Sequence, residues 1–197
     1  MKKILVLCLL VLGCSLAFAG PAHARDSRKR HAHSAAHEHG VAYMELEVDG
    51  REVEIELDSA LYNFISFENE PKTGAQKQEV RAMAARLYKA ETLFLFPAQA
   101  MCRQKDVDLD SDVIDDDLLE LKRSRSVRRD RSHSRQRGHG NLEAEFTFTC
   151  RHPERLNGVT VALFKDFPNL RQIQVRMSTP RGKKAATLSP RSNTLRW

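Results

Sequence analysis

Long apolar runs are scarce in this chain, and after residue 24 no segment is apolar enough to cross a membrane. We therefore do not expect an integral membrane protein. Catalytic signatures are missing too: the sequence has no G-x-S-x-G, no H-E-x-x-H and no glycine loop that could cradle phosphate. Since no free cysteine is expected either, we predict that the protein is not an enzyme.

The one long apolar run lies at the N-terminus. Two lysines precede a nearly unbroken apolar stretch over residues 4–18, and small residues follow at the spacing of a cleavage site. We interpret residues 1–24 as a secretory signal peptide that is cut between Ala19 and Ala24, which predicts a periplasmic protein. The alternative is a lipoprotein that is acylated at Cys14.

Cysteine is rare as well, and two of the four cysteines lie within the predicted signal peptide. Cys102 and Cys150 remain as a pair in an oxidising compartment, where such pairs form disulfides. We expect one structural disulfide, which closes a loop of about 50 residues and stabilises the fold by about 3–4 kcal/mol. Two thiolates on a metal ion are the alternative, but neither cysteine belongs to a C-x-x-C motif.

The formal net charge is +6, and the charge is unevenly distributed. Residues 106–120 are acidic, whereas residues 122–137, the basic segment, are rich in arginine. Such a segment is typical of nucleic-acid binding in a cytosolic protein, but the signal peptide argues against that partner. A second function is open instead, namely an envelope-associated interaction protein that binds anionic partners such as lipid phosphates through its arginines.

The organisation of the chain follows from where apolar periodicity is present. Residues 25–39 have none, so we predict a mobile N-terminal arm that carries histidines. Residues 40–197 are predicted to form a single domain, interrupted by a long charged insert over residues 105–141. We expect the disulfide to tie the ends of this insert together.

A β-hairpin is predicted at the start of the domain. Apolar residues alternate with glutamates on both sides of Asp49-Gly50, which favours a two-residue turn at that dipeptide. This register places Leu46 opposite Val53 and Met44 opposite Ile55, so one face of the hairpin is apolar. It also places Glu45 opposite Glu54 and Glu47 opposite Glu52. Because like charges across a ladder are destabilising, a cationic group should lie there, either arginine and lysine side chains or a metal ion.

The remaining elements complete an α+β domain. The capping-box spacing of Thr73 and Gln76 precedes a helical pattern, so we expect a helix over residues 74–90. Strands are predicted from the patterns at residues 92–96, 144–150, 159–164 and 173–177. The expected architecture is an antiparallel or mixed β-sheet of about six strands, covered by one main helix.

Histidines in the arm are the clearest chemical signal. His31, His33, His37 and His39 form two H-x-H pairs, and in an extended chain the imidazoles of each pair lie on the same side, about 6–7 Å apart. Neutral imidazoles are good Zn²⁺ ligands and serve Cu²⁺ and Ni²⁺ as well. The alternative is that the histidines are a compositional feature of a polar arm.

The sequence offers further candidate ligands for the same ion. Glu38 lies between two of the arm histidines, and His133 and His139 lie in the charged insert. A calcium loop starting at Asp106 is disfavoured, because Ser111 occupies the position where such loops require glycine and Asp117 replaces the bidentate glutamate.

Six short segments follow one another along the chain: His37–Gly40, the hairpin at Asp49-Gly50, Asn63–Pro71, Ala100–Cys102, Phe148–Cys150 and Leu163–Pro168. In this order they resemble the ZrgA family of periplasmic zinc-uptake proteins. The resemblance implies an exported zinc-binding protein that cooperates with a zinc-uptake transporter or its binding protein. It also implies a histidine-rich insert, whereas the insert of this chain carries mostly arginine.

Overall fold

The computed structural model describes residues 38–120 and 140–197. The predicted signal peptide, most of the arm and the basic segment lie outside these residues. The elements in chain order are β1 (Val41–Asp49), β2 (Glu52–Ala60), η1 (Leu61–Asn63), α1 (Gly74–Leu87), α2 (Ala90–Leu93), β3 (Phe94–Leu95), η2 (Ala98–Ala100), β4 (Cys102–Ser111), α3 (Asp116–Leu119), β5 (Asn141–Cys150), η3 (Pro153–Arg155), β6 (Gly158–Val161), α4 (Leu163–Asp166), β7 (Gln172–Thr179), β8 (Gly182–Leu188) and β9 (Thr194–Arg196).

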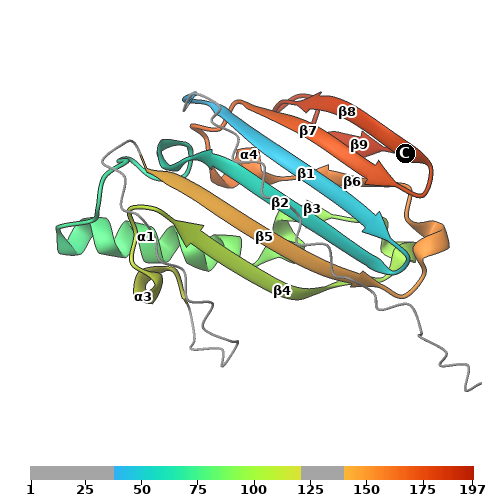
Figure 1. Cartoon of the computed structure of the whole chain (residues 1–197), viewed down its shortest axis with the longest axis horizontal. Helices are drawn as coiled ribbons and strands as arrows, with labels where there is room; N and C mark the ends of the chain where they lie inside the picture. Colours follow the sequence, from blue (N-terminus) through green and yellow to red (C-terminus); the bar gives the residue numbers. More distant parts are fainter. Residues whose placement is uncertain (1–37, 121–139) are drawn as a thin grey trace, which may run out of the picture. The chain divides into compact units, whose positions relative to one another are not determined.

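Two β-sheets organise the described residues (Figure 1). The larger sheet has six strands in the order β4-β5-β2-β1-β7-β8, and the smaller one has the order β3-β6-β9. Strand β1 runs parallel to β7, whereas the other neighbours in the large sheet are antiparallel. The expected α+β class with a mixed sheet is therefore confirmed, and the second sheet is an addition that the sequence patterns did not predict.

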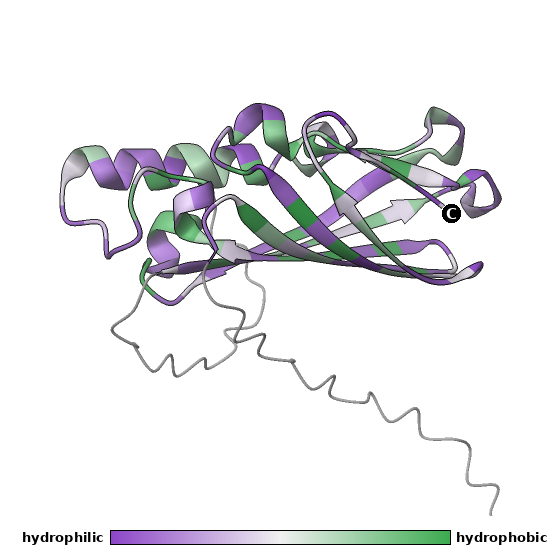
Figure 2. Cartoon of the chain, turned by 90° about the horizontal axis from the view of Figure 1, so that it is seen from above, coloured by the Kyte–Doolittle hydropathy of each residue, from purple (hydrophilic) through white to green (hydrophobic). Residues whose placement is uncertain are grey.

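The hydrophobic core lies on one side of the large sheet. Ile55, Phe146 and Phe148 on the inward face are almost fully buried, and they belong to the same cluster as Met83 and Leu87 of α1. Helix α1 and the small sheet lie behind the large sheet in Figure 1, and the view in Figure 2 shows these layers from above. The opposite face of the large sheet is consequently left for polar side chains.

Helix α1 begins where the sequence predicts. The Thr73 hydroxyl accepts a hydrogen bond from the Gln76 main-chain N–H at 3.2 Å, and the Gln76 side chain accepts one from the Thr73 N–H at 3.0 Å. These bonds satisfy donors that the first turn of a helix leaves unpaired. The helix ends at Leu87, three residues before the predicted end.

The β1–β2 hairpin forms, but its register differs from the predicted one. Leu46 pairs with Ile55, Glu45 with Glu56 and Glu47 with Glu54. The turn is therefore centred on Gly50 and Arg51 rather than on Asp49-Gly50. Gly50 has a φ of +55°, which suits the first central residue of a type II′ turn. Because the register shifts by two positions, the apolar side chains still share one face.

Two predictions about the connections are wrong. Residues 105–111, expected in the charged insert, belong to β4, because Val107 and Leu109 alternate into the core between aspartates. Cys102 and Cys150 do form a disulfide, with Cα atoms 3.8 Å apart. However, the pair lies where β4 begins and β5 ends, whereas the insert leaves from the opposite end of this strand pair. The disulfide therefore does not tie the ends of the insert.

Two short apolar segments expected as strands are partly helical. The segment over residues 92–96 is divided between α2 and β3, and the segment over residues 159–164 between β6 and α4. Both are short apolar runs, for which periodicity alone does not separate strand from helix. Among residues 38–120 and 140–197, no helix has the length and hydropathy needed to span a membrane.

Candidate metal site

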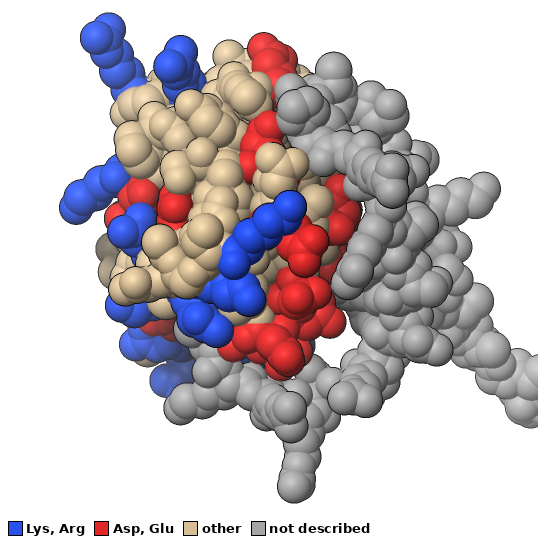
Figure 3. Space-filling model, turned by 90° about the vertical axis from the view of Figure 1, so that its left-hand side faces the viewer, with Lys and Arg blue, Asp and Glu red and all other residues tan. Residues whose placement is uncertain are grey.

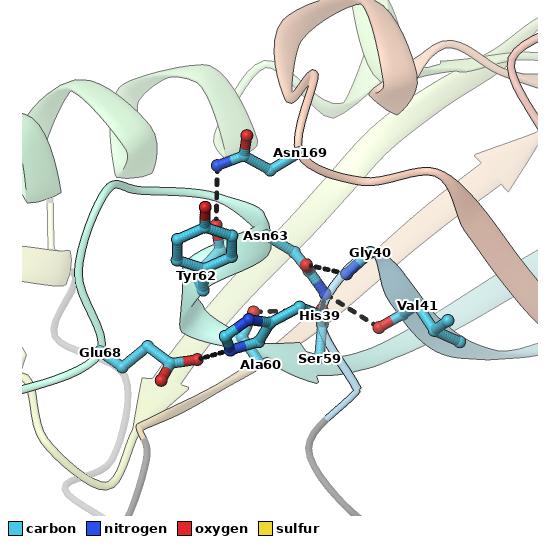
Figure 4. A network of polar contacts seen from close by, with 9 residues as sticks. All are labelled: His39, Gly40, Val41, Ser59, Ala60, Tyr62, Asn63, Glu68 and Asn169. Atoms are coloured by element: carbon cyan, nitrogen blue, oxygen red, sulfur yellow. Dashed lines mark hydrogen bonds and ion pairs between the residues drawn. The ribbon is translucent and has the colours of Figure 1, made fainter.

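His39, the last histidine of the predicted arm, lies just before β1 and contacts the connection between β2 and α1 (Figure 4). Its Nε2 atom is 2.6 Å from Oε1 of Glu68. The imidazole also stacks on the Tyr62 ring, with the ring centroids 4.4 Å apart and the planes at 20°. The side chain of His39 is 52% exposed and that of Glu68 is 10% exposed. A half-exposed imidazole therefore contacts a largely buried carboxylate.

The hydrogen bond between His39 and Glu68 leaves the second ring nitrogen of His39 available to bind a metal ion. An ionised carboxylate can only accept hydrogen bonds, so Nε2–H of His39 donates to Glu68. In that tautomer Nδ1 carries the lone pair, and it has no hydrogen-bond partner among the described residues. A histidine whose second nitrogen donates to a carboxylate is the usual arrangement of a metal-ligating imidazole, because the carboxylate orients the ring and raises its basicity.

Asn63 holds the backbone that follows His39. The side chain of Asn63 accepts a hydrogen bond from the Gly40 N–H at 2.6 Å and donates to the Val41 carbonyl and to the Ser59 hydroxyl, both at 2.9 Å. Asn63 is 1% exposed, and Gly40 has a φ of +88°, which other residues rarely adopt. The position of His39 is thus set by buried polar contacts rather than by the arm itself.

The return of the chain after the basic segment reaches the same connection. The Gly140 N–H donates to the Glu68 carbonyl at 2.8 Å, and the Gly140 carbonyl accepts from the Leu61 N–H at 2.8 Å. A Cβ atom on Gly140 would overlap Cγ2 of Val113 and lie 2.7 Å from the Glu68 carbonyl oxygen. Only glycine fits this close approach.

Glu68 therefore joins two parts of the sequence that carry histidines. Its side chain holds His39 at the end of the arm, and its main chain holds Gly140, the residue covalently bonded to His139. The connection from Leu61 to Glu68 consequently contacts the chain just before β1 and just before β5.

Most of the predicted ligands lie outside the described residues: His31, His33, His37, His133 and His139. Glu38 is described and exposed, and its main-chain carbonyl accepts a hydrogen bond from the Val41 N–H at 3.1 Å. Within residues 38–120 and 140–197, no group of three or more histidine, cysteine, aspartate or glutamate side chains is placed to hold a metal ion. The described residues thus contribute an oriented histidine rather than a complete coordination shell.

Sequence reasoning missed Tyr62 and Glu68 as neighbours of His39. Both lie in a connection without periodicity, and a single carboxylate 29 positions from a histidine carries no local signal. The one available hint was that Asn63 and Glu68 fall within the segment Asn63–Pro71, which contributes to the family resemblance.

The acidic stretch that begins at Asp106 does not form a calcium loop. Asp106, Asp108 and Asp110 alternate along β4 with buried residues. An extended strand points these carboxylates along one face of the sheet, whereas a calcium loop must wrap its ligands around one ion.

Comparison with protein families gives a match over most of the chain. No curated protein matches it. A family model described as "ZrgA family zinc uptake protein" matches residues 36–197, a region that contains every described residue. The chain therefore belongs to the ZrgA family of zinc uptake proteins.

Proposed function

We propose that this protein is an exported, non-enzymatic zinc-binding protein that assists zinc acquisition or buffering in the periplasm. The ligands are the four arm histidines, His31, His33, His37 and His39, with Glu38, His133 and His139 as auxiliary ligands. Zn²⁺ is the expected ion, and Cu²⁺ or Ni²⁺ can occupy the same imidazoles. The bound ion is cargo, which the protein passes to a zinc-uptake transporter or to its binding protein.

The contact between His39 and Glu68 is the observation that carries this proposal. A carboxylate that is 10% exposed and 2.6 Å from Nε2 orients the ring and supports a metal ion at Nδ1. The arm histidines precede His39 in the sequence, so the three other imidazoles are tethered to this anchored one. A Zn²⁺ ion takes three or four such nitrogen ligands at about 2.0–2.1 Å.

The anchoring of Gly140 to Glu68 supports the auxiliary role of His139. The peptide bond between His139 and Gly140 supplies the N–H that donates to the Glu68 carbonyl. One peptide bond therefore joins this auxiliary ligand to the residue that the Glu68 main chain holds.

The test is calorimetric titration of the signal-free, tag-free protein with ZnCl₂ at neutral pH. We expect micromolar or tighter binding in the wild type and its loss in a variant with His31, His33, His37 and His39 changed to alanine. A His152→Ala variant is the matched control, because His152 is exposed and lies 3.3 Å from Glu154. It follows the end of β5, whereas Gly140 precedes the start of that strand. Absence of zinc binding by the wild type would overturn the proposal.

A double variant, His133→Ala with His139→Ala, separates the auxiliary ligands from the arm. A lower affinity with unchanged stoichiometry would place these histidines on the same ion as the arm. Unchanged affinity and stoichiometry would leave the arm as the sole site.

A further inference from the structure

The outward face of β4, β5, β2 and β1 is built mainly from carboxylates, and we call it the acidic face. Strand register aligns its side chains in rows that run across the strands. Figure 3, which looks at one end of the molecule, shows aspartate and glutamate gathered in one band. One row contains Asp108, Glu145, Glu56 and Glu45; a second contains Asp110, Glu143 and Asp58; a third contains Asp106, Glu54 and Glu47.

Carboxylates in such rows repel one another. Side chains directly opposite across an antiparallel pair have Cβ atoms about 5 Å apart, and like charges there are destabilising. Burial raises the pKa of Glu145 above the ordinary carboxyl value, and the neighbouring charges of Glu54, Glu56 and Asp108 raise it further. The acidic face is therefore an environment that disfavours added negative charge and favours cations.

Two described cations reach the borders of the acidic face. Lys105 Nζ lies 2.6 Å from a carboxylate oxygen of Glu52, and Arg176 Nη1 lies 3.8 Å from one of Glu45. In the second row, Asp58 pairs with Tyr43 on β1, and Tyr43 pairs with Gln174 on β7. The second row therefore ends in neutral side chains. This row is also the one nearest the end of the sheet where the insert leaves and returns.

Both ends of the connection between β4 and β5 are fixed at this end of the sheet. The Ser111 hydroxyl donates to the Asn141 carbonyl at 2.6 Å, and the Asn141 N–H donates to the Asp112 side chain at 2.8 Å. The chain leaves after α3 and resumes at Gly140, immediately before β5, which carries Glu143 and Glu145. The basic segment between these points contains Lys122, Arg123, Arg125, Arg128, Arg129, Arg131, Arg135 and Arg137.

We propose that the acidic face is the docking surface for the basic segment of the same chain, with the arginines of residues 122–137 paired to the carboxylate rows of β4, β5, β2 and β1. The inference is independent of zinc binding and gives the arginines a role in place of the histidines that the family resemblance implies.

The dimensions allow this docking. The four strands span about 14 Å at a strand spacing of about 4.8 Å. A chain over residues 121–139 can extend about 60 Å at about 3.3 Å per residue, so it can cross the rows and return to Gly140. The basic segment is tethered to the acidic face by the chain itself, so it acts at an effective concentration in the millimolar range. A separate molecule in solution has no such tether.

The chemistry fits as well. A guanidinium group matches two carboxylate oxygens at once, and arginines spaced along a chain can bridge neighbouring carboxylates of one row. Exposed ion pairs are individually weak and are screened by salt, so the docking arises from many pairs and weakens as ionic strength rises.

Limited digestion with trypsin tests the proposal on the full signal-free protein, because trypsin cleaves only after a lysine or arginine side chain that enters its specificity pocket. The test variant combines Asp58→Asn with Glu143→Gln, two neighbours in the second row. Its matched control combines Asp166→Asn with Glu154→Gln, in α4 and η3. Cleavage sites are assigned by mass spectrometry, and thermal unfolding verifies that both variants fold.

At low salt we expect cleavage within residues 122–137 to be about fivefold faster in the test variant than in the wild type or the control. In the wild type alone, raising NaCl to about 0.5 M should accelerate the same cleavages, which tests the inference even if the test variant does not fold. Equal cleavage in the three proteins, with no effect of salt on the wild type, would overturn the proposal. Faster cleavage confined to residues 25–37 would also overturn it, because the arm would then be the occupant of the acidic face.

Discussion

Replacing Glu68 tests the zinc proposal at a residue that is not one of the predicted ligands. In Glu68→Gln a neutral amide oxygen can still accept the hydrogen bond from His39, so the geometry is kept while the charge is lost. In Glu68→Ala the hydrogen bond and the charge are both lost. The backbone carbonyl that holds Gly140 is unaffected in either variant. We therefore expect zinc affinity to fall in two steps, from wild type to glutamine and from glutamine to alanine.

The size of each step follows from the contact itself. The bond between Nε2 and Oε1 is 2.6 Å long, and the carboxylate is 10% exposed. Hydrogen bonds to charged groups contribute about 1.5–3 kcal/mol, and about 1.4 kcal/mol corresponds to a tenfold change in affinity. We expect zinc binding about tenfold weaker in Glu68→Gln and about 100-fold weaker in Glu68→Ala, which matches the effect of losing partners that orient metal ligands.

The assay is competition with a chromogenic zinc chelator at neutral pH, which reports affinities too tight for direct titration. Glu70→Gln is the control, because Glu70 is an exposed carboxylate two positions away with the same change in charge. If Glu68→Ala binds zinc within about twofold of the wild type while its thermal unfolding is unchanged, the contact between His39 and Glu68 does not support the metal.

Three predictions concern stability, each measured by urea unfolding. Replacing Cys102 and Cys150 by alanine should lower the free energy of unfolding by about 4 kcal/mol, because the disulfide spans 48 positions; a loss below about 1 kcal/mol would contradict this estimate. Gly140→Ala should cost about 1–3 kcal/mol, since its Cβ would overlap Val113 and the Glu68 carbonyl, and an unchanged midpoint would refute the clash. Glu145→Gln should stabilise the fold by about 0.5 kcal/mol at pH 7. The raised pKa of Glu145 means that the fold disfavours its charged form, so stability is lost as pH rises through that pKa; the gain should vanish below about pH 4.3, and a gain that persists there would contradict the assignment.

Local patterns predicted the main elements of the fold, with limited precision in their pairing. Alternation in β1 and β2 identified the buried side chains correctly, because in a strand successive residues face opposite sides. The register was wrong by two positions, since Asp49-Gly50 and Gly50-Arg51 are both acceptable turns by composition. Only the pairing of β2 with β5 and of β1 with β7 decides between them.

The charged insert shows the limit of composition as a guide. High charge over residues 105–111 favoured a loop, yet those residues make up most of β4. Aspartates on the exposed side of an edge strand are compatible with a sheet as long as the intervening positions are apolar, as Val107 and Leu109 are. The alternation of Val107 and Leu109 with aspartates was visible in the sequence, but the high charge of the segment led to the prediction of a loop.

The candidate site was likewise predicted only in part. The arm histidines are visible in the sequence because metal-binding spacing is local, whereas Tyr62 and Glu68 were not predicted. Their contacts with His39 depend on how the β2–α1 connection packs beside the start of β1, which Asn63 fixes through the Gly40 and Val41 backbone.

The sequence by itself determined which residues face the core, where α1 begins and where histidines concentrate, because each follows from residue type and spacing within a short stretch. It also determined that Cys102 and Cys150 pair, because only these two cysteines follow the predicted signal peptide. Only the tertiary structure decided that Glu68 holds both His39 and Gly140 and that carboxylates from β4, β5, β2 and β1 align in rows. These contacts join residues far apart in the chain, and they depend on strand order and register, which the packing of the whole sheet against its core selects.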